Sequence, residues 1–229
     1  MTRVTELAAL EAELVAAGLA ARGAFHPGAD DRVPALADGR PVATLVLVGT
    51  VGQRQWPAFA ASPERADGTP HPLDRWSRRA LGPIAERHAA EALYPFDGPP
   101  WHPFQRWARR AEAVHVSPLG ILIHPDWGLW HAYRDALAFA ERLKVVMREQ
   151  RPSPCASCLE RPCLHVCPVS AITSAGYDAH GCRAHLATPA GTDCIAGGCR
   201  ARRSCPVGAE HRYGAEQAEF HMQAFRRGA

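Results

Sequence analysis

Apolar residues in the first 150 positions follow helical spacing in some segments and extended spacing in others. Thr5–Leu19 carries apolar side chains at helical intervals and has Gly18 near its end, which predicts an amphipathic helix. Leu73–Ala92 and Phe104–Ala113 also read as helices, the second of them rich in arginine. Pro83 predicts a kink or a fresh start within the longer one. The residues expected to face inward in the first two helices are Leu7, Leu10, Leu14, Val15, Trp76, Leu81, Ile84, Ala85 and His88.

Two short apolar runs predict buried strands. Pro41–Val48 is rich in β-branched residues and lies between glycines, and Leu119–His124 ends at Pro125. Trp130–Arg148 stays open, because its apolar residues fit a helix and its first residues fit a strand equally well. Helices and strands in this order predict an α+β or α/β domain of about 150 residues.

The distribution of the cysteines defines a second region of the chain. All eight cysteines fall between Cys155 and Cys205, and the turn-forming segment Arg151–Pro154 precedes them. We therefore expect two domains, residues 1–150 and 151–229.

The composition and the net charge of the chain limit the classes of function that it can have. The chain has 229 residues, 47% of them hydrophobic and 21% charged, which is ordinary for a globular protein. The formal net charge of +3 is too small to indicate nucleic acid as a partner. No apolar stretch is long enough for a bilayer, and acidic residues interrupt any signal-peptide core. We expect a cytoplasmic protein, where clustered thiols favour metal or redox chemistry over disulfides.

The first cysteine motif has the spacing C-x2-C-x4-C-x3-C-P and runs from Cys155 to Pro168. A [4Fe–4S] cube needs four thiolates around it, and one tight loop supplies only three. In two-cluster ferredoxins the cysteine before proline binds the other cluster. A second motif must then exist, and a second Cys-Pro pair is found at Cys205-Pro206.

Partner exchange allocates all eight thiols to two [4Fe–4S] clusters. The sets are Cys155, Cys158, Cys163 and Cys205 for one cluster, and Cys167, Cys182, Cys194 and Cys199 for the other. Zinc is the alternative, since C-x2-C pairs also suit tetrahedral zinc, but zinc does not explain two Cys-Pro exits.

This region resembles the bacterial-type two-cluster ferredoxins. Arg161-Pro162 before the third cysteine is similar to the electron-transfer subunits of molybdenum oxidoreductases, and Cys167–Ile172 matches the usual exit into a helix. The spacing of the second motif is irregular and departs from that pattern.

The segment before the cysteines carries another resemblance. His124–Arg134 is similar to the His-Pro-x-aromatic-Gly-Gly-Trp-x-Ala-x-Arg block of cobalamin-processing, CblC-type proteins, with Leu129 in place of the second glycine. Weaker similarity covers Ala43–Val48 and His71–Asp74. The resemblance implies a nitroreductase-like α/β fold that binds cobalamin. The expected cofactor-binding residues are His124, Trp127, Gly128, Trp130 and Arg134.

These patterns favour a redox protein that passes electrons from two clusters to a bound corrinoid. The expected reaction is reduction of the corrinoid or removal of its upper ligand, and the expected partner is an electron donor such as ferredoxin or flavodoxin. Three alternatives stay open. The first region could instead dock a redox partner of a plain electron carrier, hold a flavin, or serve a tRNA-modifying enzyme similar to epoxyqueuosine reductase. His124 could be a structural hydrogen-bonded histidine, and Trp127 and Trp130 could be core residues.

Overall fold

The structure is a computed structural model, and it describes residues 7–146 and 149–228. The contacts divide the chain into two compact units. Unit 1 comprises residues 1–113 and 132–150, and unit 2 comprises residues 114–131 and 151–229. The chain therefore enters unit 2 at residue 114, returns to unit 1 at 132, and leaves again at 151. The boundary expected near residue 151 is only the last of these crossings.

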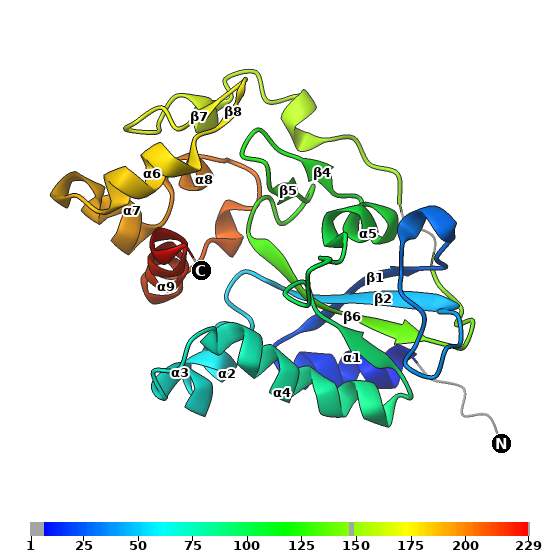
Figure 1. The fold of residues 1–229 in the computed structure, drawn as a ribbon. Coiled ribbons are helices and arrows are strands. Elements are labelled where there is room, and N and C mark those ends of the chain that lie inside the picture. Colours follow the sequence, from blue (N-terminus) through cyan, green and yellow to red (C-terminus); the bar gives the residue numbers. More distant parts are fainter. Residues whose placement is uncertain (1–6, 147–148, 229) are drawn as a thin grey trace. The chain divides into compact units, whose positions relative to one another are not determined.

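Unit 1 is built on a four-stranded sheet with the strand order β1-β2-β6-β3. Helices α1 and α4 lie on one side of this sheet and α5 on the other (Figure 1). β1 pairs with β2, and β3 with β6, both antiparallel. Its elements are α1 (Leu7–Ala16), β1 (Ala20–Phe25), η1 (Ala29–Asp31), β2 (Thr44–Val51), α2 (Trp56–Ala60), α3 (Pro63–Ala66), α4 (Pro72–Arg87), β3 (Glu91–Leu93), α5 (Phe104–Ala111) and β6 (His131–Phe139), whose first residue belongs to unit 2.

Unit 2 consists of short elements joined by turns. Two-residue strands form the hairpins β4–β5 and β7–β8. The elements are β4 (His115–Val116), β5 (Leu122–Ile123), η2 (Pro154–Ala156), η3 (Pro162–Leu164), β7 (Ile172–Thr173), β8 (Gly176–Tyr177), α6 (Ala179–Leu186), η4 (Pro189–Gly191), α7 (Thr192–Gly197), α8 (Arg200–Arg203), η5 (Ala209–His211) and α9 (Ala215–Arg227).

The predicted helices and strands exist, with shifted ends. The helix expected over Leu73–Ala92 ends at Arg87, because Glu91–Leu93 joins the sheet as β3, and it continues through Pro83. The open segment Trp130–Arg148 forms a strand in its first half, and Met147 and Arg148 lie outside the described residues. Thr5 and Glu6 of the first predicted helix also lie outside them.

Most of the expected core positions are buried, including Leu10, Leu14, Trp76 and Leu81. Val15 is an exception and is 65% exposed. Helical geometry explains the error, since Leu10 and Leu14 define one stripe at an interval of four, and the residue after Leu14 turns about 100° away from that stripe.

A buried charged network joins β1, α5 and β6. The side chain of Arg22 is fully buried and donates to both carboxylate oxygens of Glu112, at 2.8 and 2.7 Å. The hydroxyl of Tyr133 donates to the same carboxylate at 2.6 Å. Removing one partner from such a pair leaves a buried charge without compensation, which costs about 3–5 kcal/mol.

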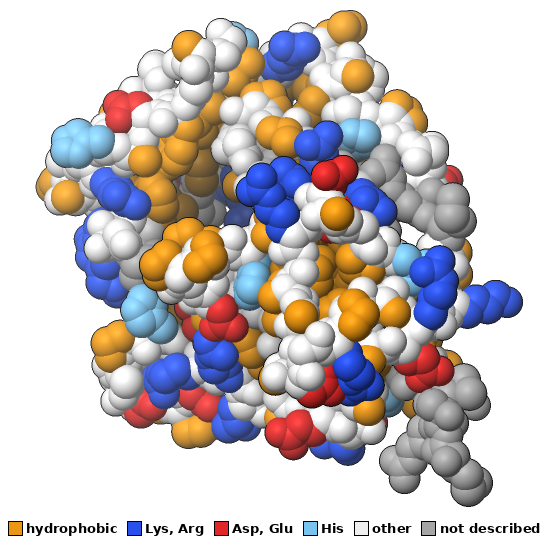
Figure 2. Space-filling model, turned by 45° about the vertical axis from the view of Figure 1, so that its right-hand side comes forward, with side chains coloured by type: hydrophobic (Ala, Val, Ile, Leu, Met, Phe, Trp, Pro, Cys, Tyr) orange, Lys and Arg blue, Asp and Glu red, His pale blue; other side chains and the backbone are white. Residues whose placement is uncertain are grey.

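No helix among the described residues is long and apolar enough to cross a membrane. On the face drawn in Figure 2, Lys and Arg side chains are interspersed with Asp and Glu side chains over much of the surface. This face therefore carries both signs of charge, in line with the small formal net charge of +3.

Asp135 of β6 gives the fold a testable pH dependence. It is completely buried, and the backbone amides of Ala136 and Leu93 approach its carboxylate. Burial raises the pKa of Asp135 to about 8, and the nearby amides of Ala136 and Leu93 only partly offset this. The folded protein then holds a proton that the unfolded chain releases near pH 4, so stability falls as pH rises from about 4 to about 8.

We expect the Asp135→Asn variant to lose this dependence, because an amide does not titrate. The free energy of unfolding, measured in urea at several pH values, should fall in the wild type by at most about 1.4 kcal/mol per pH unit within this window. Asp38→Asn, at an exposed carboxylate, should keep the slope of the wild type. Equal slopes in the wild type and in Asp135→Asn would contradict the assignment.

Candidate functional site

Two 3-10 turns present the cysteines of the first motif. The first turn, η2, is capped by Ser153, whose hydroxyl oxygen accepts from the amide of Cys155 at 3.3 Å. The second turn, η3, starts after Arg161, which adopts a left-handed conformation with φ of +40°. Each turn begins with a proline, which fixes φ near the helical value and has no N–H to satisfy.

Four thiols line the first cavity of unit 2. Three of them belong to the first motif, and the fourth comes from the second Cys-Pro pair. The four are Cys155, Cys158, Cys163 and Cys205. The rest of the wall is apolar apart from Arg161.

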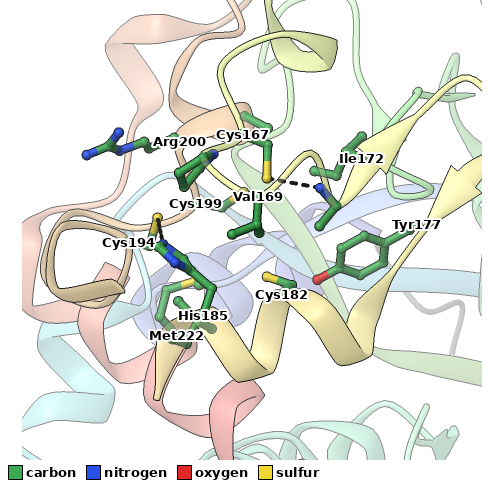
Figure 3. Close-up of a pocket in the computed structure, with 14 residues that line it drawn as sticks. Cys167, Val169, Ile172, Tyr177, Cys182, His185, Cys194, Cys199, Arg200 and Met222 are labelled. Carbon is green, nitrogen blue, oxygen red and sulfur yellow. Dashed lines mark hydrogen bonds between the residues drawn. The ribbon is translucent and has the colours of Figure 1, made fainter. Parts of the chain in front are cut away.

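A second cavity is lined by the other four thiols (Figure 3). Cys182 comes from α6, Cys194 from α7, and Cys199 caps α8. Cys167, which precedes Pro168 at the end of the first motif, completes the group. The two groups have the membership that partner exchange requires.

The pKa shifts of the thiols divide the cysteines into the same two groups. Burial raises the pKa of Cys155 and Cys163, and in both cases the next largest contribution comes from Cys205. Burial also raises the pKa of Cys182, with further contributions from Cys199, Cys167 and Cys194. Bare thiolates in either group would repel one another, so each group favours a positively charged guest that is shared by four sulfurs.

The described part of the chain contains no set of three or more His, Cys, Asp or Glu side chains that converge on a single metal ion. The thiols instead line the walls of a cavity. Backbone amides also approach the sulfurs, and the amide of Ala171 donates to Cys167 Sγ at 3.3 Å.

The His124–Trp130 segment forms a tight turn in unit 2. Backbone hydrogen bonds join His124 and Gly128 in both directions, at 2.9 and 3.0 Å. His124 Nδ1 accepts from the amides of Asp126 and Trp127, and its ring stacks on Trp127 with centroids 3.9 Å apart. His124 therefore has a structural role in the turn, whatever else it binds.

This turn packs directly on the chain that follows Cys205-Pro206. Gly128 has φ of +56°, and a Cβ placed on it would lie 1.9 Å from the carbonyl oxygen of Val207. Gly208 has φ of +65°, and a Cβ there would lie 2.3 Å from the carbonyl carbon of Trp127. Two backbones therefore meet with no room for a side chain on either glycine. Gly128, one of the predicted cofactor-binding residues, therefore lies against the loop that follows Cys205.

Trp130 closes the turn inside an aromatic and cationic cluster. Its ring meets Tyr213 edge-on, with centroids 5.4 Å apart. The guanidinium of Arg202 lies 4.6 Å from the Trp130 ring and 4.4 Å from the Tyr213 ring, and it donates to the carbonyl oxygen of Leu129. Trp130 is 4% exposed, and its indole N–H has no hydrogen-bond partner among the described residues.

Arg134, the last of the predicted cofactor residues, belongs to unit 1. Its guanidinium donates to Asp74 at 2.8 Å and to Ser77 at 3.1 Å, which fastens β6 to α4. The two similarity blocks His71–Asp74 and His124–Arg134 therefore meet through an ion pair. The structure thus separates the five predicted residues into four in unit 2 and one in unit 1.

Sequence reasoning missed three residues of this region. Gly208, Arg202 and Tyr213 hold the turn against the cysteine loops, but their partners lie about 75 residues or more away in sequence. The available signals were a glycine three residues after the last cysteine and an arginine run between Cys199 and Cys205.

Two solved structures share the fold. The B12-trafficking protein CblC of C. elegans, a homologue of human MMACHC, matches with a TM-score of 0.54 at 14% identity, over 94% of this chain and 89% of that protein. Epoxyqueuosine reductase, solved with an epoxyqueuosine-modified tRNA-Tyr stem loop, matches with a TM-score of 0.50 at 12% identity, over 92% of this chain and 68% of that one. No protein-family model and no curated protein matches the chain.

At these identities the likeness establishes the fold alone. It confirms, at that level, the resemblance to CblC-type proteins and to epoxyqueuosine reductase that the His124–Arg134 block and the cysteine pattern indicated.

The contact between the two glycines predicts a large difference between two similar substitutions. Gly128→Ala adds a Cβ where a backbone oxygen already lies, whereas Gly120→Ala adds one at a similar positive φ with nothing within 4 Å. We expect Gly120→Ala to cost about 1–2 kcal/mol from the backbone conformation alone. Gly128→Ala should cost about 1–3 kcal/mol more from overpacking. Unfolding in urea measures both, and equal losses would argue against close packing of the turn.

Proposed function

We propose that this chain is a two-cluster iron–sulfur protein that delivers electrons to a corrinoid. The observation that carries the proposal is the division of eight cysteines into two groups of four, each around its own cavity and each completed by a thiol from the other motif. A ferredoxin-like arrangement of unit 2 follows from this exchange.

The donor sets fit [4Fe–4S] clusters in number and chemistry. Four thiolates hold such a cube, and here four thiols surround a space rather than converge on a point. When bound, each cluster would supply reversible one-electron transfer at low potential. The chain's own contribution is to bury the sulfurs and to aim N–H and O–H donors at them.

The corrinoid part of the proposal rests on two supports. The fold is that of a B12-trafficking protein, and the His124–Arg134 block has the residue pattern of cobalamin-processing proteins. Trp130 is the strongest candidate contact, because its buried indole N–H is left for an acceptor such as a corrin side-chain amide. Trp127, Gly128 and His124 would shape the turn that presents it.

A second candidate is a reductase acting on a modified nucleoside in RNA. The match to epoxyqueuosine reductase favours it, since that structure contains a tRNA stem loop. The formal net charge of +3 weighs against it, because RNA binding usually shows a basic footprint. Both candidates need the same clusters and a reducing compartment, which agrees with the cytoplasmic location that the sequence indicates.

Paired cysteine substitutions test the exchange of thiols. Anaerobically purified protein should contain roughly eight iron atoms and eight acid-labile sulfides per chain. Cys155→Ala with Cys205→Ala removes two ligands of one cluster and should leave about half of the iron. Cys182→Ala with Cys205→Ala removes one ligand from each cluster and should lose iron from both.

Iron and sulfide assays with EPR of the reduced protein measure these losses. Equal iron in the two double variants would contradict the allocation, and a colourless or zinc-loaded wild type would remove the redox proposal altogether.

Titration with hydroxocobalamin tests the corrinoid site by its visible spectrum. We expect the wild type to bind and to shift the spectrum toward the base-off form. Trp130→Phe keeps an aromatic ring against Arg202 but lacks the N–H, so its affinity should drop roughly five- to tenfold, the worth of one buried hydrogen bond. Trp101→Phe, at a largely exposed tryptophan of unit 1, is the matched control. If the wild type at micromolar concentration left the spectrum unchanged, that result would exclude the proposed corrinoid site.

A further inference from the structure

The hydroxyl of Tyr177 points at a thiol of the second cysteine group (Figure 3). Tyr177 ends β8 and lines the second cavity, and its hydroxyl oxygen faces the sulfur of Cys182 (Figure 3). A phenol ordinarily has a pKa of about 10, so this hydroxyl carries its proton at neutral pH and can donate to the sulfur.

Local structure fixes this contact. Tyr177 pairs with Ile172 across the β7–β8 hairpin. The next residue, Asp178, caps α6, because its carboxylate accepts from the amide of Gly181 at 2.9 Å. Cys182 lies in the first turn and a half of this helix, so the hairpin and the cap together set the phenol beside the thiol.

The first cysteine group has a weaker counterpart. The hydroxyl of Ser153 contacts Cys155 and lowers the pKa of that thiol, against the larger opposing effect of burial. An aliphatic hydroxyl is a poorer proton donor than a phenol. The backbone amide of Val207 also approaches Cys205. The remaining wall is mostly proline and aliphatic side chains, which offer no donor. These wall residues are Pro118, Ile123, Pro154, Pro162, Pro206 and Val207.

The second group is richer in polar neighbours. The amide of Ala171 donates to Cys167, and His185 Nε2 lies 4.0 Å from Cys194 Sγ. Arg200 also lines this cavity, whereas Arg161 is the charged residue in the lining of the first. Hydrogen bonds and positive charge near cluster sulfurs stabilise the reduced, more negative state and so raise the reduction potential.

We infer that Tyr177 is a tuning residue, which raises the reduction potential of the cluster held by Cys167, Cys182, Cys194 and Cys199 above that of the other cluster. The inference rests on the proposed two-cluster function. It makes the second group the site where a single electron first resides, and the first group the more strongly reducing site. Tyr177 acts through the sulfur of Cys182 and is not itself a ligand.

The test is an anaerobic redox titration of the iron-loaded protein, followed by EPR. Wild type should show two midpoint potentials. Tyr177→Phe removes one hydroxyl and keeps the ring, so the more positive potential should move to a more negative value while the other stays. Ser153→Ala should shift only the more negative potential, and by less. Tyr94→Phe makes the same chemical change in unit 1 and should shift neither.

Fully loaded Tyr177→Phe with unchanged potentials would overturn the inference, and so would a shift confined to the more negative wave. If Tyr177→Phe does not hold iron, 3-fluorotyrosine can be incorporated into the wild type to test the opposite change. A more acidic phenol donates more strongly, so the more positive potential should rise, and no rise would also overturn the inference. Failure of the underlying function is distinguishable, because the wild type would then contain no iron.

Discussion

Each of the two cysteine loops is one thiol short without the other. Cys167 leaves the first loop to line the cavity of the second group, and Cys205 leaves the second loop to line the cavity of the first. The first group combines residues 155–163 with Cys205, and the whole second group lies in the sequence between them, so residues 155–205 are constrained as one body. The short elements of unit 2 follow from this constraint, since turns and single helical turns are what bring thiols from several directions around a small space.

A contact between two backbones adds residues 114–131 to that body. Gly128 and Gly208 lie against Val207 and Trp127, in conformations that side chains disfavour. Arg202 strengthens the same contact from α8, which lies between Cys199 and Cys205. A segment that resembles a cofactor-binding motif therefore also holds the last cysteine loop in place. The two roles are compatible, because the indole N–H of Trp130 is not used in this packing.

The cysteine grouping could be predicted because it depends on spacing and on two Cys-Pro pairs, which are local features. Helix α5 and the core stripe of α4 were predictable for the same reason. The strand β1 could not be predicted. An arginine such as Arg22 indicates a surface position, and it is buried here only because Glu112, 90 positions later in the sequence, neutralises its charge. The division of the chain into units was not predictable either. Unit 2 includes the contact of residue 128 with residue 207, and no local sequence pattern predicts a contact between segments so far apart.

The chain passes between the two units three times, and this has a consequence for dividing the chain. Because the hairpin β4–β5 is encoded ahead of β6, unit 2 is built from two separate stretches of the chain. Cutting at residue 151 would leave β4 and β5 on one piece and the loop they pack against on the other. Transfer of unit 2 to another protein would therefore require both of its stretches, residues 114–131 and 151–229, without the rest of β6, which lies between them in the sequence.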